Sequence, residues 1–421
     1  MNVIIAGGGA AGMFAAACLA EKGISVTIIE HNEKLGKKLF ITGKGRCNFT
    51  NACTVDEFMG QILSNPKFMY SAANAFPPSA TMNWFEEHGL AIKTERGRRV
   101  FPESDRAIDV IDTLNGVLKK HHVRVLLNTE LLSISTAEDG SFRSVTVKDK
   151  KGKKKLSGDT LILATGGRSY PSTGSVGDSY RFAEDLHMEV TGLYPSLVPF
   201  VCREEFVRMM QGLSIKNVRL RIKEGKKTLF DEFGELLFTH FGISGPLVLS
   251  ASAKTGPMIG KRKLLTEIDL KPAVTAEELS KRFENTFKEN PKKYLKNILT
   301  EFYPQKMAPV IPSLAGLDPL RTCASISGAE RDALVQVTKH FPLTVTALRG
   351  YNEAIITKGG ISVKEISPRT MESKQHPGIY VVGEMLDLDA YTGGYNLQIA
   401  WSTAYAAAEA ISASQYPEIE R

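Results

Sequence analysis

Apolar runs alternate with segments of helical length at the start of the chain. Val3 to Ala6 is an uninterrupted apolar run, which predicts a buried strand. From Ala10 to Lys22 small and apolar residues continue for the length of a helix, and Gly23 supplies its stop. Ser25 to Ile29 predicts a second strand. Strand, helix and strand in this order predict a parallel βαβ unit of an α/β fold.

Two apolar runs much later in the chain repeat this pattern. Thr160 to Ala164 predicts a strand that ends in a Thr-Gly-Gly turn, and Ile379 to Val382 predicts one that ends in Gly-Glu. A Gly-Gly turn then opens a helix from about Asn396. Before these two runs, "SDRAIDVIDTLNGVLKKHH" predicts a helix capped by Ser104, and "HHVRVLLNTELLSIS" predicts a pair of strands. All of these elements are expected to belong to one domain.

The pattern changes in the middle of the chain. Short alternating segments with turn residues, such as "KNVRLRI" and "KTLFDEFGELLFTHFG", predict a β-barrel-like domain over residues 191–274 and 341–354. Residues 275–340 have helical periods, as in "TAEELSKRFENTF", and predict a small helical subdomain. Residues 1–190 and 355–421 are then the first domain. A chain of 421 residues is long enough for this division.

The charge of the chain is modest but unevenly placed. Lys and Arg exceed Asp and Glu by seven, and the excess gathers in clumps such as "KDKKGKKK" and "ERGRR". The first clump separates two strand-like segments and predicts a hairpin tip. Such clumps fit solvated turns and are also compatible with an anionic partner such as nucleic acid. No apolar run approaches the roughly 20 residues that span a bilayer, which favours a cytoplasmic protein without a membrane partner.

Five scattered cysteines exclude a disulfide scaffold, and no cysteine–histidine cluster has zinc spacing. Cys47 and Cys53 lie six residues apart, which leaves open a redox pair or two reduced thiols. No metal site is expected.

The glycines after the first strand have the spacing of a dinucleotide-binding turn. Gly7 is expected to permit the tight turn, Gly9 to let the backbone approach a pyrophosphate, and Gly12 to pack the helix against the strand. The helix N-terminus would then present bare N–H groups to the phosphates. Glu30 ends the second strand, where a carboxylate accepts hydrogen bonds from a ribose 2′-OH. Together these features predict a bound adenine dinucleotide.

The later segments favour FAD over NAD as that dinucleotide. They resemble the second crossing and the flavin-binding segment of the two-dinucleotide flavoproteins, in which a carboxylate after the strand binds a ribityl hydroxyl and a late helix faces the flavin. No second GxGxxG follows a strand, so NAD(P)H is expected to visit transiently as electron donor. The expected fold is α/β: a Rossmann-type FAD-binding domain of that superfamily with an inserted β-barrel-like domain and a small helical domain.

The chain as a whole resembles one family, the BaiN/RdsA-type flavoproteins, also described as YhiN-like or aminoacetone-oxidase-like FAD/NAD(P)-dependent proteins. The matching stretches span nearly the whole chain: "IIAGGGAAGM", "GKKLFITGKGRCNFTN", "ERGRRVFPESDRAIDVIDTL", "LATGGRSYPSTGSVGDSY", "GELLFTHFGISGPLVLS" and "GEMLDLDAYTGGYNLQIAWSTA". The second and the last are specific to the family, whereas the first is common to many flavoproteins.

The resemblance implies which residues contact the cofactor. The segment after Glu30 runs along the FAD toward its ring, and the backbone at Leu131 touches adenine. The complete set of expected FAD contacts is Gly7, Gly9, Ala10, Ala11, Gly12, Glu30, His31, Lys37, Lys38, Gly45, Arg46, Leu131, Thr165, Gly166, Gly383, Glu384, Gly393, Gly394, Asn396 and Leu397.

Three residues are expected near the reacting atoms: Cys47, Asn48 and Tyr395. Arg46 and Asn48 would form a cationic, amide-rich wall beside the flavin, and Asn48 could otherwise cap a local turn. Cys47 is either a small packing residue or the acid that gives a proton to substrate. Tyr395 and Tyr391 are further candidate acids, with ring packing as the alternative.

Two outcomes are known for the family, and both reduce a C=C bond conjugated to a carbonyl. The resemblance and the basic clumps favour conversion of uridine to dihydrouridine in large-subunit ribosomal RNA. The first alternative is reduction of a small-molecule enone related to steroids or bile acids. The second is a non-catalytic module, stabilised by FAD, that binds RNA or protein.

Overall fold

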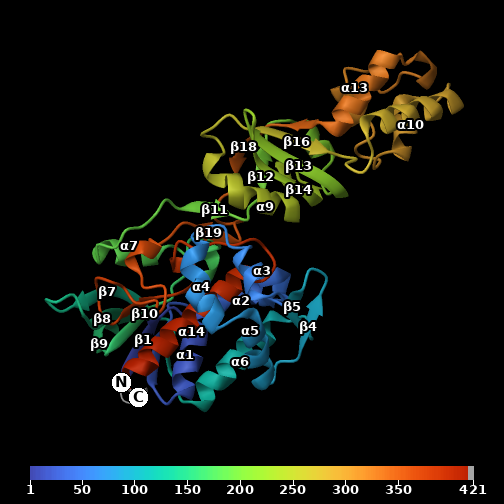
Figure 1. The fold of residues 1–421 in the computed structure, drawn as a ribbon. Helices are drawn as coiled ribbons and strands as arrows, with labels where there is room; N and C mark the ends of the chain where they lie inside the picture. Colours follow the sequence, from blue (N-terminus) through green and yellow to red (C-terminus); the bar gives the residue numbers. More distant parts are fainter. Residues whose placement is uncertain (416–421) are drawn as a thin grey trace. The chain divides into compact units, whose positions relative to one another are not determined.

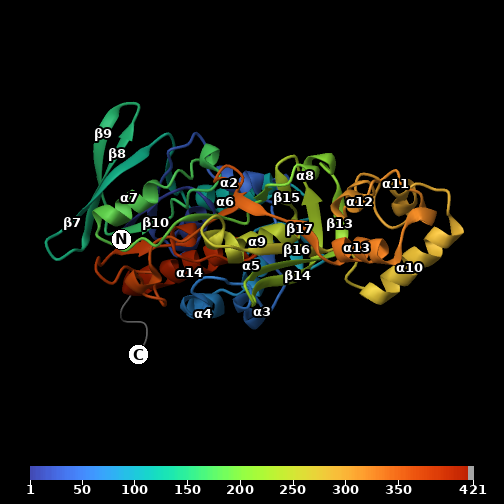
Figure 2. The ribbon, with the colours of Figure 1, turned by 90° about the horizontal axis from the view of Figure 1, so that it is seen from above.

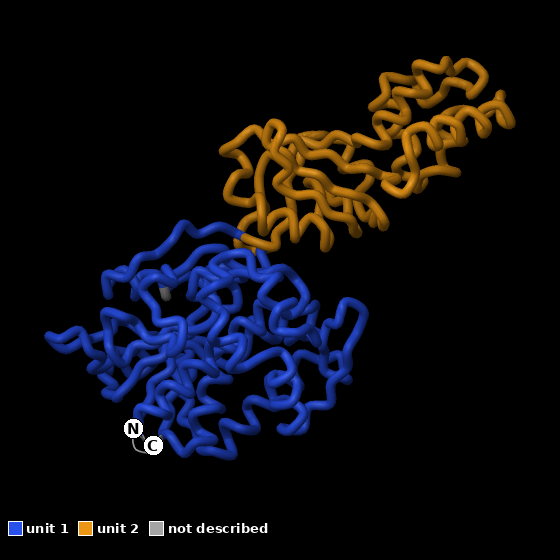
Figure 3. The backbone as a smooth tube through the Cα atoms, viewed as in Figure 1, with its two compact units in different colours: residues 1–195, 354–421 blue, residues 196–353 orange. Residues whose placement is uncertain are grey.

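The computed structural model describes residues 1–415, which form two compact units. Unit 1 comprises Met1–Pro195 and the chain from Ala354 onward, and unit 2 comprises Ser196–Glu353 (Figure 3). The chain therefore enters and leaves unit 2 once each. The further division of the inserted part into a β-domain and a helical subdomain stays a prediction.

A five-stranded parallel sheet organises unit 1 (Figure 1). Its strand order is β20-β10-β1-β2-β6, so β1 lies at the centre and the chain moves outward from it in both directions. The strands are β1 (Asn2–Ala6), β2 (Ser25–Ile29), β6 (Arg124–Leu126), β10 (Thr160–Leu163) and β20 (Ile379–Val381). The predicted strands are confirmed to within one residue at each end. In such sheets, ligands bind beyond the carboxyl ends of the strands, where the order reverses.

Two helices from opposite ends of the chain pack together beside this sheet. They are α1 (Ala10–Glu21) and α14 (Tyr395–Gln415), and both carry mainly small apolar residues (Figure 1). Ten residues of α1 are buried, and so are eleven of α14. Helices that are apolar all round lie in a core, and alanine-rich faces let two helices approach closely. The turn at Gly383 thereby comes close to the start of α1, because a methyl group added at Gly383 would lie 3.0 Å from the Cβ of Ala11.

Unit 1 also contains two small three-stranded antiparallel sheets. One has the order β3-β5-β4, and the other has the order β7-β8-β9. The hairpin predicted around "KDKKGKKK" is confirmed, because β8 and β9 pair in antiparallel register on either side of it. The strands are β3 (Thr50–Asn51), β4 (Ile92–Glu95), β5 (Arg99–Pro102), β7 (Glu130–Thr136), β8 (Phe142–Asp149) and β9 (Gly152–Ser157).

Further helices of unit 1 are α2 (Lys37–Ile41), α3 (Val55–Met59), α4 (Pro66–Ala75), α5 (Pro78–Glu87), α6 (Ala107–Lys120) and α7 (Asp178–Asp185). The prediction that Ser104 caps α6 is wrong. The N-cap is Arg106, whose side chain makes no capping hydrogen bond. Asp105 has a φ of 58°, so the chain turns once more before the helix begins. Ser104 Oγ instead accepts a bond from the backbone N–H of Arg106 and donates to Asp109 Oδ2.

A seven-stranded sheet is the centre of unit 2, with the order β17-β16-β13-β14-β15-β12-β18. The two edge strands, β17 (Phe341–Leu343) and β18 (Val345–Leu348), are separated in the chain by Thr344 alone. The sheet must therefore curl until its edges meet, which explains the barrel-like pattern read from the sequence. The other strands are β12 (Phe200–Cys202), β13 (Ser214–Glu224), β14 (Lys227–Phe238), β15 (Gly242–Ser244) and β16 (Leu265–Asp269).

Unit 2 also contains six described α-helices. They are α8 (Phe206–Met209), α9 (Pro246–Thr255), α10 (Ala276–Glu289), α11 (Leu295–Ile298), α12 (Val310–Leu314) and α13 (Gly328–Lys339). The last four lie in residues 275–340, where the periodicity predicted helices, whereas the first two lie in the segment predicted as β-structure, so that prediction is wrong for residues 206–209 and 246–255. A two-stranded ladder of β11 (Tyr194–Ser196) and β19 (Ile356–Lys358) lies where the chain leaves unit 1 and returns. Across residues 1–415, none of the helices combines the length and the apolar character that crossing a bilayer requires.

A capping box starts α13 and makes the stability of unit 2 sensitive to acid. Ser327 and Glu330 exchange hydrogen bonds, and Arg321 donates to the Glu330 carboxylate. The Arg321 bond, followed by the bonds from Ser327, lowers the pKa of Glu330 to about 2. The unfolded value is about 4.3. Because the folded-state pKa is the lower one, this contribution is present above about pH 4.3 and is lost as the pH falls toward 2.

Replacing Glu330 with glutamine is therefore expected to reduce stability at neutral pH and to flatten its decline between pH 5 and 2. Urea midpoints from circular dichroism measure this. Fluorescence of Trp84 and Trp401, both in unit 1, identifies any transition of that unit. The matched control is E277Q, an exposed glutamate in the first turn of α10. Parallel pH curves for wild type and E330Q would contradict the assignment.

Candidate functional site at the edge of the parallel sheet

The three glycines of the first turn meet three different surroundings. Gly7 has a φ of 107°, and a methyl group added there would lie 2.4 Å from the carbonyl oxygen of Ala164. A methyl group at Gly12 would lie 1.9 Å from the carbonyl oxygen of Gly7. At Gly9, by contrast, φ is an ordinary −84° and no atom lies within 4 Å of such a methyl group. Gly7 and Gly12 are therefore fixed by the fold, whereas Gly9 leaves space beside the start of α1.

The start of α1 is a suitable anion site. Gly9 is the N-cap and provides no side-chain capping bond, so the first N–H groups of this twelve-residue helix have no side-chain partner there. The partial positive charge of a helix N-terminus favours phosphate at such a place. The space beside Gly9 lets a pyrophosphate reach these groups.

Glu30 lies beside the same turn, at the end of β2. Its carboxylate is buried, with Oε2 accepting the N–H of Gly8 at 2.8 Å. Oε1 accepts both the backbone and the side-chain N–H of Asn32, at 2.8 and 2.7 Å. Lys37 in turn donates to Asn32 Oδ1 at 3.1 Å. A carboxylate oxygen accepts more than one bond, so Glu30 keeps capacity for a ribose hydroxyl.

Glu384 joins the two ends of unit 1. Lys38 Nζ lies 2.6 Å from Glu384 Oε2, and the hydroxyl of Ser169 and the N–H of Thr357 donate to Oε1 at 2.8 and 2.9 Å. The sequence singled out Lys38 and Glu384 separately but did not predict that they pair. It missed Ser169 and Thr357, because nothing local marks a residue that reaches a partner 215 or 27 positions away.

Gly383 fixes the approach of the C-terminal segment to α1. Its φ is 70°, and an added methyl group would lie 3.0 Å from the Cβ of Ala11. Its N–H donates to Thr403 Oγ1 at 3.0 Å, which ties the turn to α14. Gly394 is similarly constrained, because an added methyl group there would lie 2.2 Å from the carbonyl oxygen of Thr50. Both glycines are needed for close contact between segments.

The loop from Thr42 to Asn51 is held against α14. Its backbone is left-handed at Gly43, Gly45 and Cys47, so the two glycines accommodate tight turns. Asn51 Nδ2 donates to the carbonyl oxygen of Gly393 at 3.0 Å. The Trp401 indole donates to the carbonyl oxygen of Phe49 at 2.8 Å, and Thr50 Oγ1 lies 2.5 Å from Gln398 Oε1. These bonds fix the loop against the start of α14, and its contact with a cofactor stays a prediction.

The Arg46 side chain is held by two acids. Its guanidinium bonds to Glu95 and Asp105 and lies 4.2 Å from the centre of the Phe101 ring. The Asp105 pKa is lowered by hydrogen bonds from Lys93 and from Arg46. Two carboxylates thus neutralise Arg46, and its contact with a flavin stays a prediction.

The three predicted catalytic residues differ in how far their side chains are buried. Cys47 is fully buried, and this burial raises the pKa of its thiol to about 12. Asn48 has a buried side-chain oxygen, Oδ1, with no hydrogen-bond partner among the described residues. Tyr395 is partly buried over Gly393 and stacks on Phe58 with 6.3 Å between ring centres. Desolvation raises the pKa of the Tyr395 hydroxyl.

Other predicted contacts have structural partners of their own. The Asn396 side chain braces the preceding loop, bonding to the backbone N–H and carbonyl of Ala390 at 2.9 Å each. Thr165 donates to the sulfur of Met385 at 3.3 Å through its N–H. Leu131 is buried in β7. The structure also describes His31, Ala10, Ala11, Gly45, Gly166 and Leu397, whose cofactor contacts stay predictions.

A buried ion pair that the sequence did not reveal supports the site. Lys358 Nζ lies 2.9 and 3.1 Å from the two carboxylate oxygens of Asp389 and 2.9 Å from Ser64 Oγ. The Asp389 side chain is completely buried, whereas that of Lys358 is 20% exposed. Lys358 follows Thr357, the residue whose N–H contacts Glu384. The pair thus joins β19 to the segment that leads into α14.

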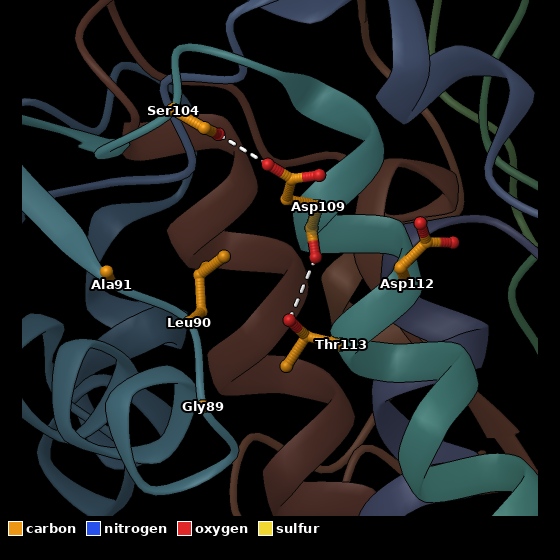
Figure 4. Close-up of a pocket in the computed structure, with 7 residues that line it drawn as sticks. All are labelled: Gly89, Leu90, Ala91, Ser104, Asp109, Asp112 and Thr113. Atoms are coloured by element: carbon orange, nitrogen blue, oxygen red, sulfur yellow. Dashed lines mark hydrogen bonds between the residues drawn. The ribbon is translucent and has the colours of Figure 1, made fainter.

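A separate cavity of about 430 Å³ opens beside the start of α6 (Figure 4). Asp109 and Asp112 give it an acidic lining, and Ser104 and Thr113 are both hydrogen-bonded to Asp109. An acidic wall does not suit a pyrophosphate. None of the predicted site residues is among those that line the cavity: Gly89, Leu90, Ala91, Ser104, Asp109, Asp112 and Thr113.

These residues fit an FAD molecule on three counts. The first turn presents backbone N–H groups beside the space at Gly9. The buried oxygen of Asn48 lacks a partner and can accept a hydrogen bond from a ligand. The Lys38–Glu384 pair stands between segments from both chain ends, with its side chains 23% and 21% exposed.

Comparison with known proteins agrees with this architecture. The chain is 34% identical over 415 residues to the ribosomal RNA dihydrouridine synthase of Haemophilus influenzae, with 98% of each chain covered. It is 29% identical over 415 residues to the 3-dehydro-bile acid delta(4,6)-reductase of Clostridium scindens, covering 97% of this chain and 99% of that one.

A solved structure has the same fold at low sequence identity. The 3-ketosteroid-delta4-(5alpha)-dehydrogenase of Rhodococcus jostii RHA1 superposes with a TM-score of 0.53 at 13% identity, covering 96% of each chain. The family described as "HI0933-like protein Rossmann domain" matches residues 1–410. With the glycine turn, the parallel sheet and the junction of both chain ends in place, this match shows that the chain belongs to the HI0933-like Rossmann family.

Proposed function

We propose that this protein is an FAD-dependent oxidoreductase that reduces uridine to dihydrouridine in large-subunit ribosomal RNA, with NAD(P)H as the electron donor. The observation that carries the proposal is the junction at the carboxyl edge of the parallel sheet. There the bare start of α1 and the Lys38–Glu384 pair come together from opposite ends of the chain. The relative from Haemophilus influenzae supports the choice of substrate by its name.

The chain's own residues would divide the binding of FAD among three places. The N–H groups at the start of α1 bind the pyrophosphate, and Glu30 accepts the ribose hydroxyl. Glu384, held by Lys38 and Ser169, accepts a ribityl hydroxyl at the other end. The bound FAD supplies hydride transfer to an electron-poor carbon.

Asn48 is the residue proposed to polarise the substrate. The reduced C=C bond is conjugated to a carbonyl, whose oxygen gains negative charge during the reaction. Side-chain amide donors placed at such an oxygen stabilise the transition state. Asn48 lies in the loop that packs against α14, and its Oδ1 has no partner among the described residues and would accept a hydrogen bond from the bound cofactor. The Nδ2 hydrogens of the same amide would then donate to the carbonyl oxygen of the substrate.

Tyr395 is the stronger candidate for the proton donor. Burial raises the pKa of both Tyr395 and Cys47, so each keeps its proton at neutral pH. The Cys47 thiol is fully enclosed, whereas Tyr395 retains exposed surface at the start of α14. A positioned acid contributes roughly 10²–10⁴ in rate.

Replacing Asn48 with alanine is expected to slow substrate reduction by about 10²–10³-fold, because one oxyanion donor is lost. The stability of the apoprotein should change little, since the buried oxygen has no hydrogen-bond partner within residues 1–415 that the substitution would remove. Single-turnover oxidation of the reduced protein by substrate, together with urea unfolding, measures both effects. Two further variants compare the candidate proton donors, Y395F and C47A. If C47A slows substrate reduction as much as Y395F does, Cys47 and not Tyr395 alone has to be considered as the acid.

The test of the function is dihydrouridine in large-subunit ribosomal RNA. Deleting the gene should remove a dihydrouridine that the wild-type gene restores and that a G9V gene does not. Mass spectrometry of nuclease digests measures the modification. An unchanged dihydrouridine content after deletion would eliminate ribosomal RNA as the substrate.

Reduction of a small-molecule enone is the second candidate, favoured by the relative from Clostridium scindens. Anaerobic mixing of the reduced protein with a 3-oxo-Δ4 steroid tests it, and oxidation of the flavin on mixing would support it. The third candidate is a non-catalytic module, stabilised by FAD, that binds RNA or protein. Failure of both NADH and NADPH to bleach the bound flavin, with RNA binding intact, would favour that reading.

A further inference from the structure

Most of the excess charge of the chain lies in one hairpin. Residues 142–157 contain seven basic residues and one acidic residue, a net charge of +6, and the whole chain has a net charge of +7. The other residues together are therefore almost neutral. The exposed lysines of this segment are here called the lysine hairpin, and they are Lys148, Lys150, Lys151, Lys153 and Lys155.

The strand register places like charges directly against one another. Lys148 on β8 is the direct partner of Lys153 on β9, and Thr146 is the direct partner of Lys155. Facing side chains in adjacent strands lie about 5 Å apart, and like charges in that position are destabilising. On its other side Lys148 faces Glu130 of β7, but the two form no ion pair among the described residues. Lys154, on the opposite side of the ladder, does form one, with Asp149 at 2.6 Å. The lysine hairpin makes no ion pair within residues 1–415.

Protection of a sheet edge explains only part of this arrangement. Lysines on an exposed edge strand discourage pairing with other chains, and β9 is such an edge. Lys148, however, lies on β8, the central strand of the three, and Lys150 and Lys151 lie in the turn. Protection of the sheet edge therefore does not account for the positive charge at these three positions.

The surroundings of the lysine hairpin suit a polyanion with a polar backbone. The facing positions on β7 and β8 include the hydroxyls of Ser133 and Thr146, which pair across the two strands. Glu130 is the acidic residue paired with Lys148. No large apolar side chain between residues 128 and 157 is exposed, so the surface offers nothing to insert into a membrane. Figure 2 shows β8 and β9 projecting from the body of unit 1.

We propose that the lysine hairpin binds the phosphate backbone of the RNA substrate. This inference rests on the proposed function, since it assigns a docking surface to that substrate. Lysines contact phosphates as point charges and release counterions, which gives affinity without sequence preference. Hydroxyl donors add contacts to phosphate and sugar oxygens. The hairpin therefore positions the RNA, and the site at the sheet edge selects the base.

The test uses the full-length FAD-loaded protein and an unmodified large-subunit ribosomal RNA transcript. The variant is K148Q/K151Q/K153Q/K155Q, which removes four charges and keeps side-chain length. Its affinity for the transcript at about 0.1 M salt should fall at least about tenfold, and the slope of log K against log salt should drop by about 3. Filter binding measures both quantities without requiring turnover.

The matched control is K216Q/K226Q/K227Q/K263Q, which removes four charges from exposed lysines of unit 2. It should bind the transcript as wild type does. The hairpin variant and the control variant should both contain as much FAD as wild type and should unfold at the same urea concentration as wild type. A hairpin variant with unchanged affinity and salt slope, or a control that loses as much as the hairpin variant, would overturn the proposal.

Two further measurements distinguish RNA binding by the lysine hairpin from membrane binding and from failure of the proposed reaction. Binding to vesicles of 30% phosphatidylglycerol that depends on the hairpin, with no such dependence for RNA, would assign the surface to membranes and refute the proposal. Loss of the proposed function has a different signature. Hairpin-dependent RNA binding together with an absence of dihydrouridine formation would keep the surface and reject the reaction.

Discussion

Replacing Gly12 with valine is expected to lower the stability of unit 1, whereas replacing Gly9 with valine is expected to lower the affinity for FAD. G12V should destabilise unit 1 by about 3 kcal/mol or more, because its Cβ would lie 1.9 Å from the carbonyl oxygen of Gly7 and backbone must move. G9V should stay within about 1 kcal/mol of wild type, since its Cβ meets open space at an ordinary φ. Its affinity for FAD should nevertheless fall at least about 100-fold, because valine fills the space for the pyrophosphate.

Urea unfolding of the apoprotein, followed by the fluorescence of Trp84 and Trp401, isolates unit 1. Titration with FAD gives the affinity of each variant that folds. G9A is the graded control and should lose less affinity than G9V. A G9V protein that binds FAD like wild type would show that the cofactor lies elsewhere.

Replacing Lys358 with methionine is expected to lower the stability of unit 1 by about 3–5 kcal/mol. The change leaves the carboxylate of Asp389 buried without its charged partner. The double variant K358M/D389L should recover much of this loss, because replacing both members of a buried pair by apolar residues is often close to neutral. The same tryptophan fluorescence measures both.

An exposed pair provides the control for this prediction. Lys288 and Glu284 lie 2.6 Å apart on α10, and K288M should cost less than about 1 kcal/mol. Equal losses in K358M and K288M would mean that Asp389 is solvated, and a double variant as unstable as K358M would mean that the loss comes from packing. Either result contradicts the account of the pair.

The local part of the site could be predicted from the sequence because its signals are local. The spacing of Gly7, Gly9 and Gly12 between an apolar strand and a helix specifies a turn that few other structures require. The methyl-group distances bear out the expected roles of Gly7 and Gly12 in turn and packing. Glu30 was placed beside that turn because β2 is parallel to β1 and ends at the same edge.

The long-range part could not be predicted for a physical reason. A lysine 31 positions from an aspartate carries no sign of pairing, so Lys358 and Asp389 were missed. The neighbours of Arg46 in the loop do not indicate its ion partners either, because these acids are 49 and 59 positions away, and its contact with the cofactor stays a prediction. Ser104 has the right residue type for a cap, and the left-handed Asp105 moves the helix start beyond its reach. Residue type limits the choices, but only the packing of distant segments decides between them.

We propose that both ends of the chain hold one FAD molecule at the edge of the parallel sheet. The direct measurement is the cofactor content of the purified protein, from the visible absorbance of the flavin released on denaturation. We expect about one FAD per chain, retained through gel filtration and absent from G9V. A colourless protein that takes up no FAD on incubation would contradict the account.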